Sequence, residues 1–254
     1  MKVNNQKNIK IRNIAPIVIW LLLILLFSQQ QWWANMLHSF SNADQALLYE
    51  QTPLIGLLKQ HLFIIFFATL CIVLTAIPLA IIVTRSWGKA FLPLVRNLST
   101  ISQTLPPMAV LFLFLPVLGF GANVVIFSLF LFGLMPVLQA TLTGLSTVDQ
   151  QLKEAAQGIG LSPSQILWKV ELPLALPSIL SGLRTSILLI IATAALAPMV
   201  GAESLGSPII VGFSINSTSQ ILQGAIAVAL LSIVTDYSLR TMEQQLTKWR
   251  TISS

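Results

Sequence analysis

The stretch that constrains the fold most is the polar loop at residues 146–173, STVDQQLKEAAQGIGLSPSQILWKVELP, which separates two apolar runs. Ser146 and Asp149 resemble a capping box, which predicts the start of a short helix. Apolar residues recur at helical spacing along this helix, at Val148, Leu152, Ala155, Ala156 and Ile159. We therefore predict an amphipathic helix with one apolar face.

The second half of the loop predicts another short helix. Gly158 and Gly160 permit the left-handed backbone that ends the first helix. The second helix begins with a cap, a first-turn proline and a glutamine that reaches back to the cap, at Ser162, Pro163 and Gln165. Pro173 ends this helix or bends it into the next apolar run. The residues predict a compact helix–turn–helix, and the alternative is an amphipathic connector that lies on lipid.

The chain as a whole has the composition of a membrane protein. Of its 254 residues, 55% are hydrophobic and 9% are charged, against roughly 25% charged residues in a typical soluble domain. The net charge of +6 comes from short basic clusters between apolar runs, which is the membrane pattern and argues against nucleic-acid binding. The single cysteine, Cys71, lies in an apolar run, and we interpret it as a small hydrophobic residue.

Long runs without charged residues predict an all-α membrane protein with six spans, since a span needs ~20 mostly apolar residues. We place the spans at 14–33, 61–83, 92–118, 122–143, 177–200 and 220–239. Trp32 and Trp33 follow the first run where a signal peptide would have a cleavage site, so we expect an uncleaved helix. The third run contains Pro106, Pro107 and Pro116, which predicts either a helix that lines a pathway or an ordinary kinked helix.

The basic residues predict the orientation of the chain. With the N-terminus inside, only Lys59 lies on an outer segment, and the inner segments hold most of the other basic residues. These are Lys2, Lys7, Lys10, Arg12, Arg85, Lys89, Arg96, Lys153, Lys169, Arg240, Lys248 and Arg250. We expect both termini in the cytoplasm. Residues 1–60 then hold the tail, first span and outer segment, 61–240 the transmembrane domain, and 241–254 a cytoplasmic tail.

The loop also resembles a known family motif. Glu154-Ala155-Ala156, three residues, Gly160, nine residues and Val170-Glu171-Leu172-Pro173 are similar to the EAA loop of ABC importer permeases of the type I, MetI-like fold. Val170 alone replaces the usual isoleucine. The resemblance implies that the loop docks in a groove of a cytoplasmic ATPase. It assigns this coupling role to Glu154, Ala155, Ala156, Gly160, Val170, Leu172 and Pro173.

Further stretches resemble the quaternary-amine branch of these permeases, which imports glycine betaine, choline and carnitine. They are residues 103–111, 200–206 and 221–226. Glu203 and Ser204 stand where the branch usually has two glycines. Methionine importers share parts of these patterns, so a permease for methionine or another small solute is the alternative. An ion-coupled secondary transporter is disfavoured because the middles of the predicted spans carry no ionisable residues.

The resemblance implies a set of partners. The chain has no phosphate-binding loop and binds no cofactor itself, so ATP and Mg belong to a cytoplasmic ABC ATPase present in two copies. A second permease, identical or homologous, and a periplasmic or lipid-anchored substrate-binding protein complete the assembly in the lipid of the bacterial inner membrane. No nucleic acid is expected. Residues considered for the pathway or gate are Pro106, Pro107, Met108, Arg184 and Glu203, although snorkelling to the inner surface is the default interpretation of Arg184.

Overall fold

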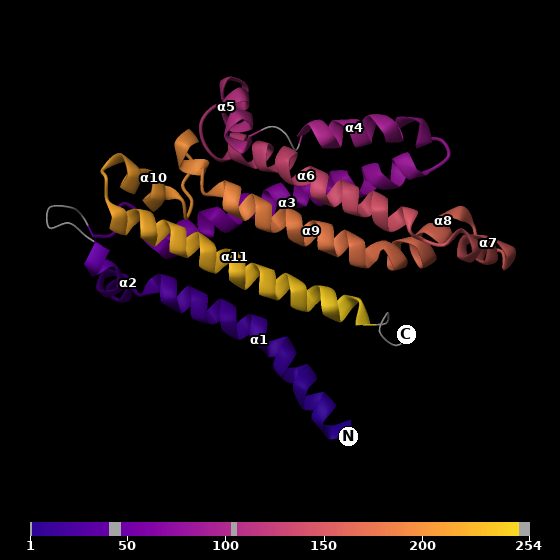
Figure 1. Cartoon of the computed structure of the whole chain (residues 1–254), viewed down its shortest axis with the longest axis horizontal. Coiled ribbons are helices and arrows are strands. Elements are labelled where there is room, and N and C mark those ends of the chain that lie inside the picture. The colour runs from indigo at the N-terminus through magenta and orange to yellow at the C-terminus, as the bar shows by residue number, and fades with distance from the viewer. Residues whose placement is uncertain (1, 41–46, 103–105, 249–254) are drawn as a thin grey trace. The chain divides into compact units, whose positions relative to one another are not determined.

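The protein is built from helices, and the computed structural model describes residues 2–40, 47–102 and 106–248 (Figure 1). No strand occurs within these three ranges. The α-helices are α1 (Lys2–Ser28), α2 (Gln30–Leu37), α3 (Leu54–Thr84), α4 (Leu92–Ser102), α5 (Pro107–Leu118), α6 (Ala122–Ser146), α7 (Gln150–Gly158), α8 (Pro163–Ile166), α9 (Leu172–Ala194), α10 (Ser207–Ser214) and α11 (Thr218–Leu246). Short turns η1 (His38–Phe40), η2 (Lys89–Phe91), η3 (Leu167–Glu171) and η4 (Ala197–Val200) connect or extend them. The prediction of an all-α membrane protein is confirmed.

Four of the helical segments are long and apolar enough to cross a membrane: α3, α6, the continuous run 163–194 that includes α9, and α11. A fifth is counted if the bent pair of helices at 14–28 and 30–40, which meet at 74°, forms one span. The bend lies at Gln29, whose φ of −92° and ψ of 78° leave the helical region. The predicted first span, 14–33, is therefore bent at Gln29 and not one continuous helix. The count of six spans stays a prediction.

The third predicted span, 92–118, is not one helix. It consists of α4 and α5, and the residues between them, 103–105, lie outside the described ranges. α5 has only 12 residues, too few for a typical span. Pro107 occupies the first position of α5, where its missing N–H costs no helical hydrogen bond. A residue before a proline is also restricted away from the helical region, which explains why α5 begins at the Pro106-Pro107 pair.

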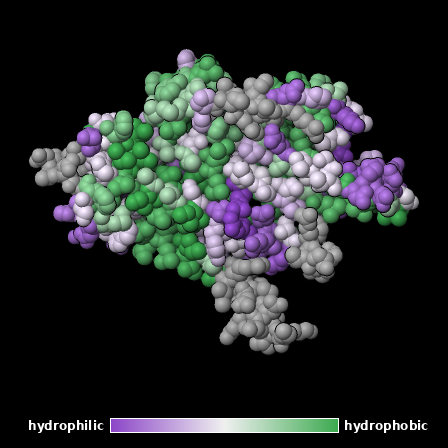
Figure 2. Space-filling view, viewed as in Figure 1, coloured by the Kyte–Doolittle hydropathy of each residue, from purple (hydrophilic) through white to green (hydrophobic). Residues whose placement is uncertain are grey.

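The chain divides into two compact units. Unit 1 contains Met1–Ala68, Pro107–Leu129 and Leu188–Met242, and unit 2 contains Thr69–Pro106, Phe130–Ile187 and Glu243–Ser254. In unit 1 the Trp20 indole N–H donates to Ser238 Oγ at 3.0 Å and ties α1 to α11. Figure 2 shows a broad hydrophobic surface over these two helices. That surface is what lipid would cover in a membrane protein.

Unit 2 depends on close packing between α6 and α9. Ser178, Gly182 and Ser186, four residues apart in the fifth predicted span, face α6 along one side of α9. A Cβ atom added to Gly182 would lie 2.3 Å from the Ala140 Cβ, so only glycine fits there without a shift. Ser186 Oγ donates to the Gly133 carbonyl at 2.7 Å in the buried interface. The two helices thus hold the ends of the loop between them in a defined register.

Candidate functional site

The loop that joins α6 to α9 begins with a helix cap. Asp149, not Ser146, is the N-cap of α7, because its carboxylate accepts a hydrogen bond of 2.9 Å from the Gln151 backbone N–H. Ser146 is the last residue of α6, and its hydroxyl donates to the Thr143 carbonyl at 2.8 Å. The predicted capping box at 146–149 is therefore wrong. Asp149 caps α7 without Ser146. Its carboxylate, two residues before Gln151, reaches a backbone N–H that has no partner within the helix.

The apolar residues of α7 divide between two environments. Val148 and Ala156 are buried, at 7% exposure each, and hold α7 against the rest of unit 2. Leu152 and Ile159 are 45% and 80% exposed, and Ala155 between them is exposed too. The single apolar face predicted for this helix is thus split, and an exposed apolar stripe, Leu152, Ala155 and Ile159, faces outward.

The turn after α7 has the geometry of a Schellman motif. The Leu161 N–H donates to the Ala156 carbonyl at 3.1 Å, and the Gly160 N–H donates to the Gln157 carbonyl at 2.9 Å. Gly160 has a φ of +88°, the left-handed conformation that this motif requires. The prediction for Gly160 is confirmed. That for Gly158 is wrong, because this residue is the last helical residue of α7 and has no positive φ.

The start of α8 is as predicted. Ser162 Oγ accepts from the Gln165 N–H, the Gln165 side chain accepts from the Ser162 N–H, and Pro163 is the first helical residue. The helix does not end at Pro173, however. The backbone passes through the π turn η3 directly into α9. The wider hydrogen-bonding pattern of a π turn accommodates a proline ring and its missing N–H, so the helix continues.

The strongest interactions of this loop converge on Glu171. This carboxylate is buried, with 6% of its side chain exposed, and pairs with the guanidinium of Arg85 after the end of α3. Its second oxygen lies 3.6 Å from the Lys153 ammonium of α7. We call these three residues the Glu171 cluster. The cluster lines a cavity of about 210 Å³ together with Gln150, Glu154, Gln157, Leu161, Pro163 and Ile166.

The sequence patterns did not predict the Glu171 cluster, although one signal was present. Glu171 is an acid at the entrance to a long apolar run, and a buried charge of this kind needs a partner. Glu154, by contrast, is exposed and accepts a hydrogen bond from the Gln150 side chain, at 3.2 Å. The structure therefore gives the two glutamates of the loop different environments: Glu171 anchors the loop, and Glu154 faces outward.

A second polar region lies in unit 1, in the loop before α10. Glu203 Oε1 accepts from the Thr52 hydroxyl at 2.8 Å, and Oε2 accepts from the Gln60 side-chain amide at 2.7 Å. Ser204 Oγ accepts from the Gly206 N–H at 3.0 Å. A glycine at either position has no side chain for these bonds. Glu203, which departs from the family pattern, therefore bonds this loop to the segment at the start of α3. Ser204, the second departure, bonds to the backbone of the same loop.

The buried His61 adds a further tie in the same unit. Its Nδ1 accepts from the Leu205 N–H at 3.3 Å, and the whole residue is 0% exposed. The loop is thus hydrogen-bonded to α3 on either side of residue 204. His61 holds a backbone in place here, and no hydrogen bond to its Nε2 occurs among the described residues.

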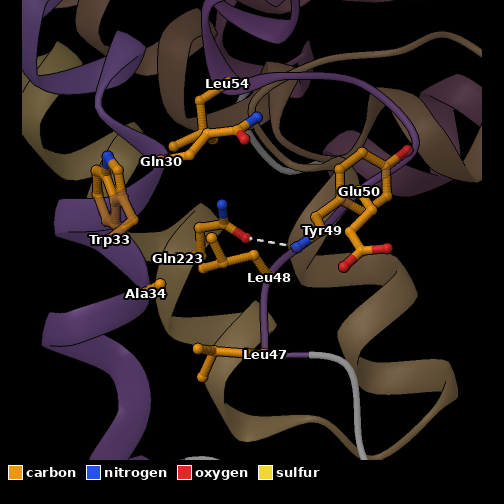
Figure 3. Close-up of a pocket in the computed structure, with 9 residues that line it drawn as sticks. All are labelled: Gln30, Trp33, Ala34, Leu47, Leu48, Tyr49, Glu50, Leu54 and Gln223. Atoms are coloured by element: carbon orange, nitrogen blue, oxygen red, sulfur yellow. Dashed lines mark hydrogen bonds between the residues drawn. The ribbon is translucent and has the colours of Figure 1, made fainter.

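The segment before α3 is held by two glutamines of α11. Gln223 Oε1 accepts from the Tyr49 N–H at 2.9 Å (Figure 3). Gln220 Nε2 donates to the Leu48 carbonyl at 3.1 Å. A cavity of about 350 Å³ lies between this segment and α2, and Glu50 is the acidic residue among the described residues that line it. Burial, and then the neighbouring charge of Glu203, raise the pKa of the Tyr49 phenol above its usual value.

The remaining residues considered for a pathway do not form one cluster. Pro106 and Met108 flank the start of α5 and are exposed. Arg184 lies within α9, and its guanidinium is 3.9 Å from the Glu243 carboxylate in unit 2. Nothing in these contacts assigns them to a pathway.

Comparison with known proteins identifies the family. Residues 76–248 match the family described as binding-protein-dependent transport system inner membrane component. The chain is 38% identical over 188 residues to the choline transport system permease protein OpuBB of Bacillus subtilis, covering 74% of this chain and 86% of that protein. It is 37% identical over 192 residues to the osmoprotectant import permease protein OsmY of Salmonella typhimurium, covering 76% and 81%.

Solved structures show the same fold. A chain of the MetNI methionine ABC transporter in an inward-facing conformation superimposes with a TM-score of 0.67 at 19% identity, covering 74% of this chain and 94% of that chain. An amino acid ABC transporter with histidines superimposes with a TM-score of 0.64 at 18% identity, covering 75% and 92%. The chain therefore belongs to the binding-protein-dependent inner membrane component family, and is a non-enzymatic ABC transporter permease subunit whose ATPase is a separate protein.

Proposed function

We propose that this permease imports a quaternary amine osmoprotectant, such as glycine betaine, choline or carnitine, across a bacterial inner membrane. The observation that supports this most is the identity of 36–38% to permeases named for choline, glycine betaine, carnitine or osmoprotectant transport. The methionine transporter is similar at only 19% identity, which supports a shared fold and not a shared substrate. Methionine, or another small solute, remains the alternative cargo.

We propose that the working assembly has two copies of the ATPase, which hold ATP and Mg, a second permease subunit and a substrate-binding protein. The binding protein delivers substrate to the outer face. ATP binding brings the ATPases together and moves the loops of the two permeases, so that the pathway alternates between inward-facing and outward-facing states. The part that this chain supplies is a rigid loop that transmits the motion.

The loop at 146–173 is the proposed contact with the ATPase. Glu154 and Ala155 are exposed on α7, where a carboxylate can make a charge-assisted bond and a methyl group permits close approach. Ala156 is buried and packs α7 onto its own unit. Val170, Leu172 and Pro173 lie at the junction of η3 with α9. Of these, Leu172 packs against the buried cluster formed by Leu145, Ala175 and Ile179.

The proposed topology has six spans with both termini in the cytoplasm, which puts the loop on the ATPase side. Reporter fusions after Leu118 and Thr218 are expected to show periplasmic activity, because the basic residues of the flanking segments stay inside. Fusions after Thr147 and Trp249 are expected to show cytoplasmic activity. A cytoplasmic signal after Thr218 would contradict the topology.

The substrate assignment is tested by uptake. Cells without other osmoprotectant importers receive this gene together with those of its ATPase and binding protein. We expect saturable uptake of labelled glycine betaine or choline that disappears when this gene alone is deleted. Excess unlabelled quaternary amine is expected to compete, and excess methionine is not. Competition by methionine with none from any quaternary amine would overturn the assignment.

Substitution of Gly160 tests the coupling role of the loop. A left-handed backbone costs a residue with a Cβ about 1–2 kcal/mol, and β-branched residues tolerate it least. Nothing lies within 4 Å of an added Cβ at this position, so backbone strain is the only expected effect. We expect Gly160→Val to reach the membrane at near-normal levels and to lose most substrate-stimulated ATP hydrolysis.

Gly160→Asn is the matched control, because asparagine adopts the left-handed conformation more readily. It is expected to retain most of the stimulated hydrolysis and to co-purify with the ATPase, whereas Gly160→Val co-purifies poorly. Full uptake by a stably expressed Gly160→Val variant would show that the loop is a passive connector.

A further inference from the structure

The strongest candidate for an additional binding site is a cavity in unit 1 beside Glu203. Its volume of about 670 Å³ is in the range of small-molecule sites. The lining that bears on its chemistry comes from α3, with Gln60, Phe63 and Ile64, and from Ala122 and Glu203. The wall thus combines one carboxylate and the side chain of Lys59 with an aromatic ring and aliphatic groups.

The Glu203 carboxylate is positioned but not neutralised. Its two oxygens accept hydrogen bonds from Thr52 and Gln60, which are both uncharged. Each carboxylate oxygen has a further lone pair, so an additional partner is accommodated. Lys59 also lines the cavity, but no ion pair joins its ammonium to Glu203 in the part of the chain that the structure describes. The Glu203 carboxylate and the Lys59 side chain therefore line the same cavity without an ion pair between them among the described residues.

The rest of the wall suits a methylated cation better than a primary ammonium group. Phe63 is 53% exposed and packs against Phe67 with ring centroids 4.6 Å apart. A cation within about 6 Å of such a ring is attracted by its quadrupole. Ile64 and Ala122 offer apolar contact to methyl groups, whereas a primary ammonium would need acceptors for three N–H donors.

We infer that this cavity binds the methylated ammonium end of a quaternary amine, with Glu203 as its counter-charge. The inference rests on the proposed function for the choice of ligand. It adds a substrate-binding residue on the permease itself, at a position where the family pattern usually has glycine. The site is therefore a property of this chain's residue 203 and not of the fold.

Binding of choline to the purified permease–ATPase complex in lipid nanodiscs tests the inference, in the absence of the binding protein. Calorimetry measures the binding of choline and, for comparison, of 3,3-dimethylbutan-1-ol, which has the shape of choline without its charge. We expect Glu203→Gln to weaken choline binding roughly tenfold, equivalent to about 1.4 kcal/mol, because the variant keeps the side-chain size and loses the charge. Binding of the neutral analogue is expected to be unchanged.

Two further variants separate charge from structure. Glu203→Asp keeps the charge and is expected to bind choline better than Glu203→Gln. Glu50→Gln removes the acid that lines the cavity beside α2 in the same unit (Figure 3) and is expected to have no effect. Equal choline binding by wild type and Glu203→Gln would overturn the inference, and so would an equal loss in Glu50→Gln.

These results are distinct from those that test the substrate of transport. If cells take up quaternary amines through this permease but choline binding does not depend on Glu203, only the site is wrong. If choline binds the complex in a Glu203-dependent manner and no quaternary amine is taken up, only the transport assignment is wrong.

Discussion

The pairing of the buried Glu171 carboxylate is the interaction on which the loop between α6 and α9 depends. A carboxylate with 6% of its side chain exposed is tolerated only when opposite charges replace the water that it has lost. Arg85 and Lys153 supply those charges from the end of α3 and from α7. Leaving such a charge unpaired costs about 3–5 kcal/mol. The pairing therefore links the distant segment after α3 to two points of the loop within unit 2.

This anchoring holds the exposed face of α7 in a fixed position on unit 2. Val148 and Ala156 attach one side of the helix, the Glu171 cluster holds Lys153, and the exposed apolar stripe of Leu152, Ala155 and Ile159 stays outward. The close contact of Gly182 in α9 with α6 leaves no space for α9 and α6 to approach further. A partner that pushes on α7 therefore acts on a packed unit and not on a flexible connector, which is what force transmission requires.

Sequence patterns predicted two features of this loop that are determined by residues close together in the sequence. The capping box at Ser162 and the turn at Gly160 involve residues within a few positions of each other, and cap chemistry determines both. The sequence patterns gave no signal for the π turn before Pro173 or for the break at Gln29. The Glu171 cluster was missed because Arg85 pairs with Glu171 from a distant segment. The partners of Glu203 were missed for the same reason, since Thr52 lies 151 positions away. The resemblance to the family motif drew attention to this loop, but did not indicate which of its residues face outward.

The most direct test of the account is a double-mutant cycle between Arg85 and Glu171, measured as substrate-stimulated ATP hydrolysis by the complete transporter. If Glu171 anchors the loop through Arg85, Glu171→Gln and Arg85→Gln each reduce stimulation while basal hydrolysis persists. The double variant then loses little more than the worse single variant, because neighbouring charges in one network are not additive. Additive losses, or full stimulation in Glu171→Gln, would contradict the account.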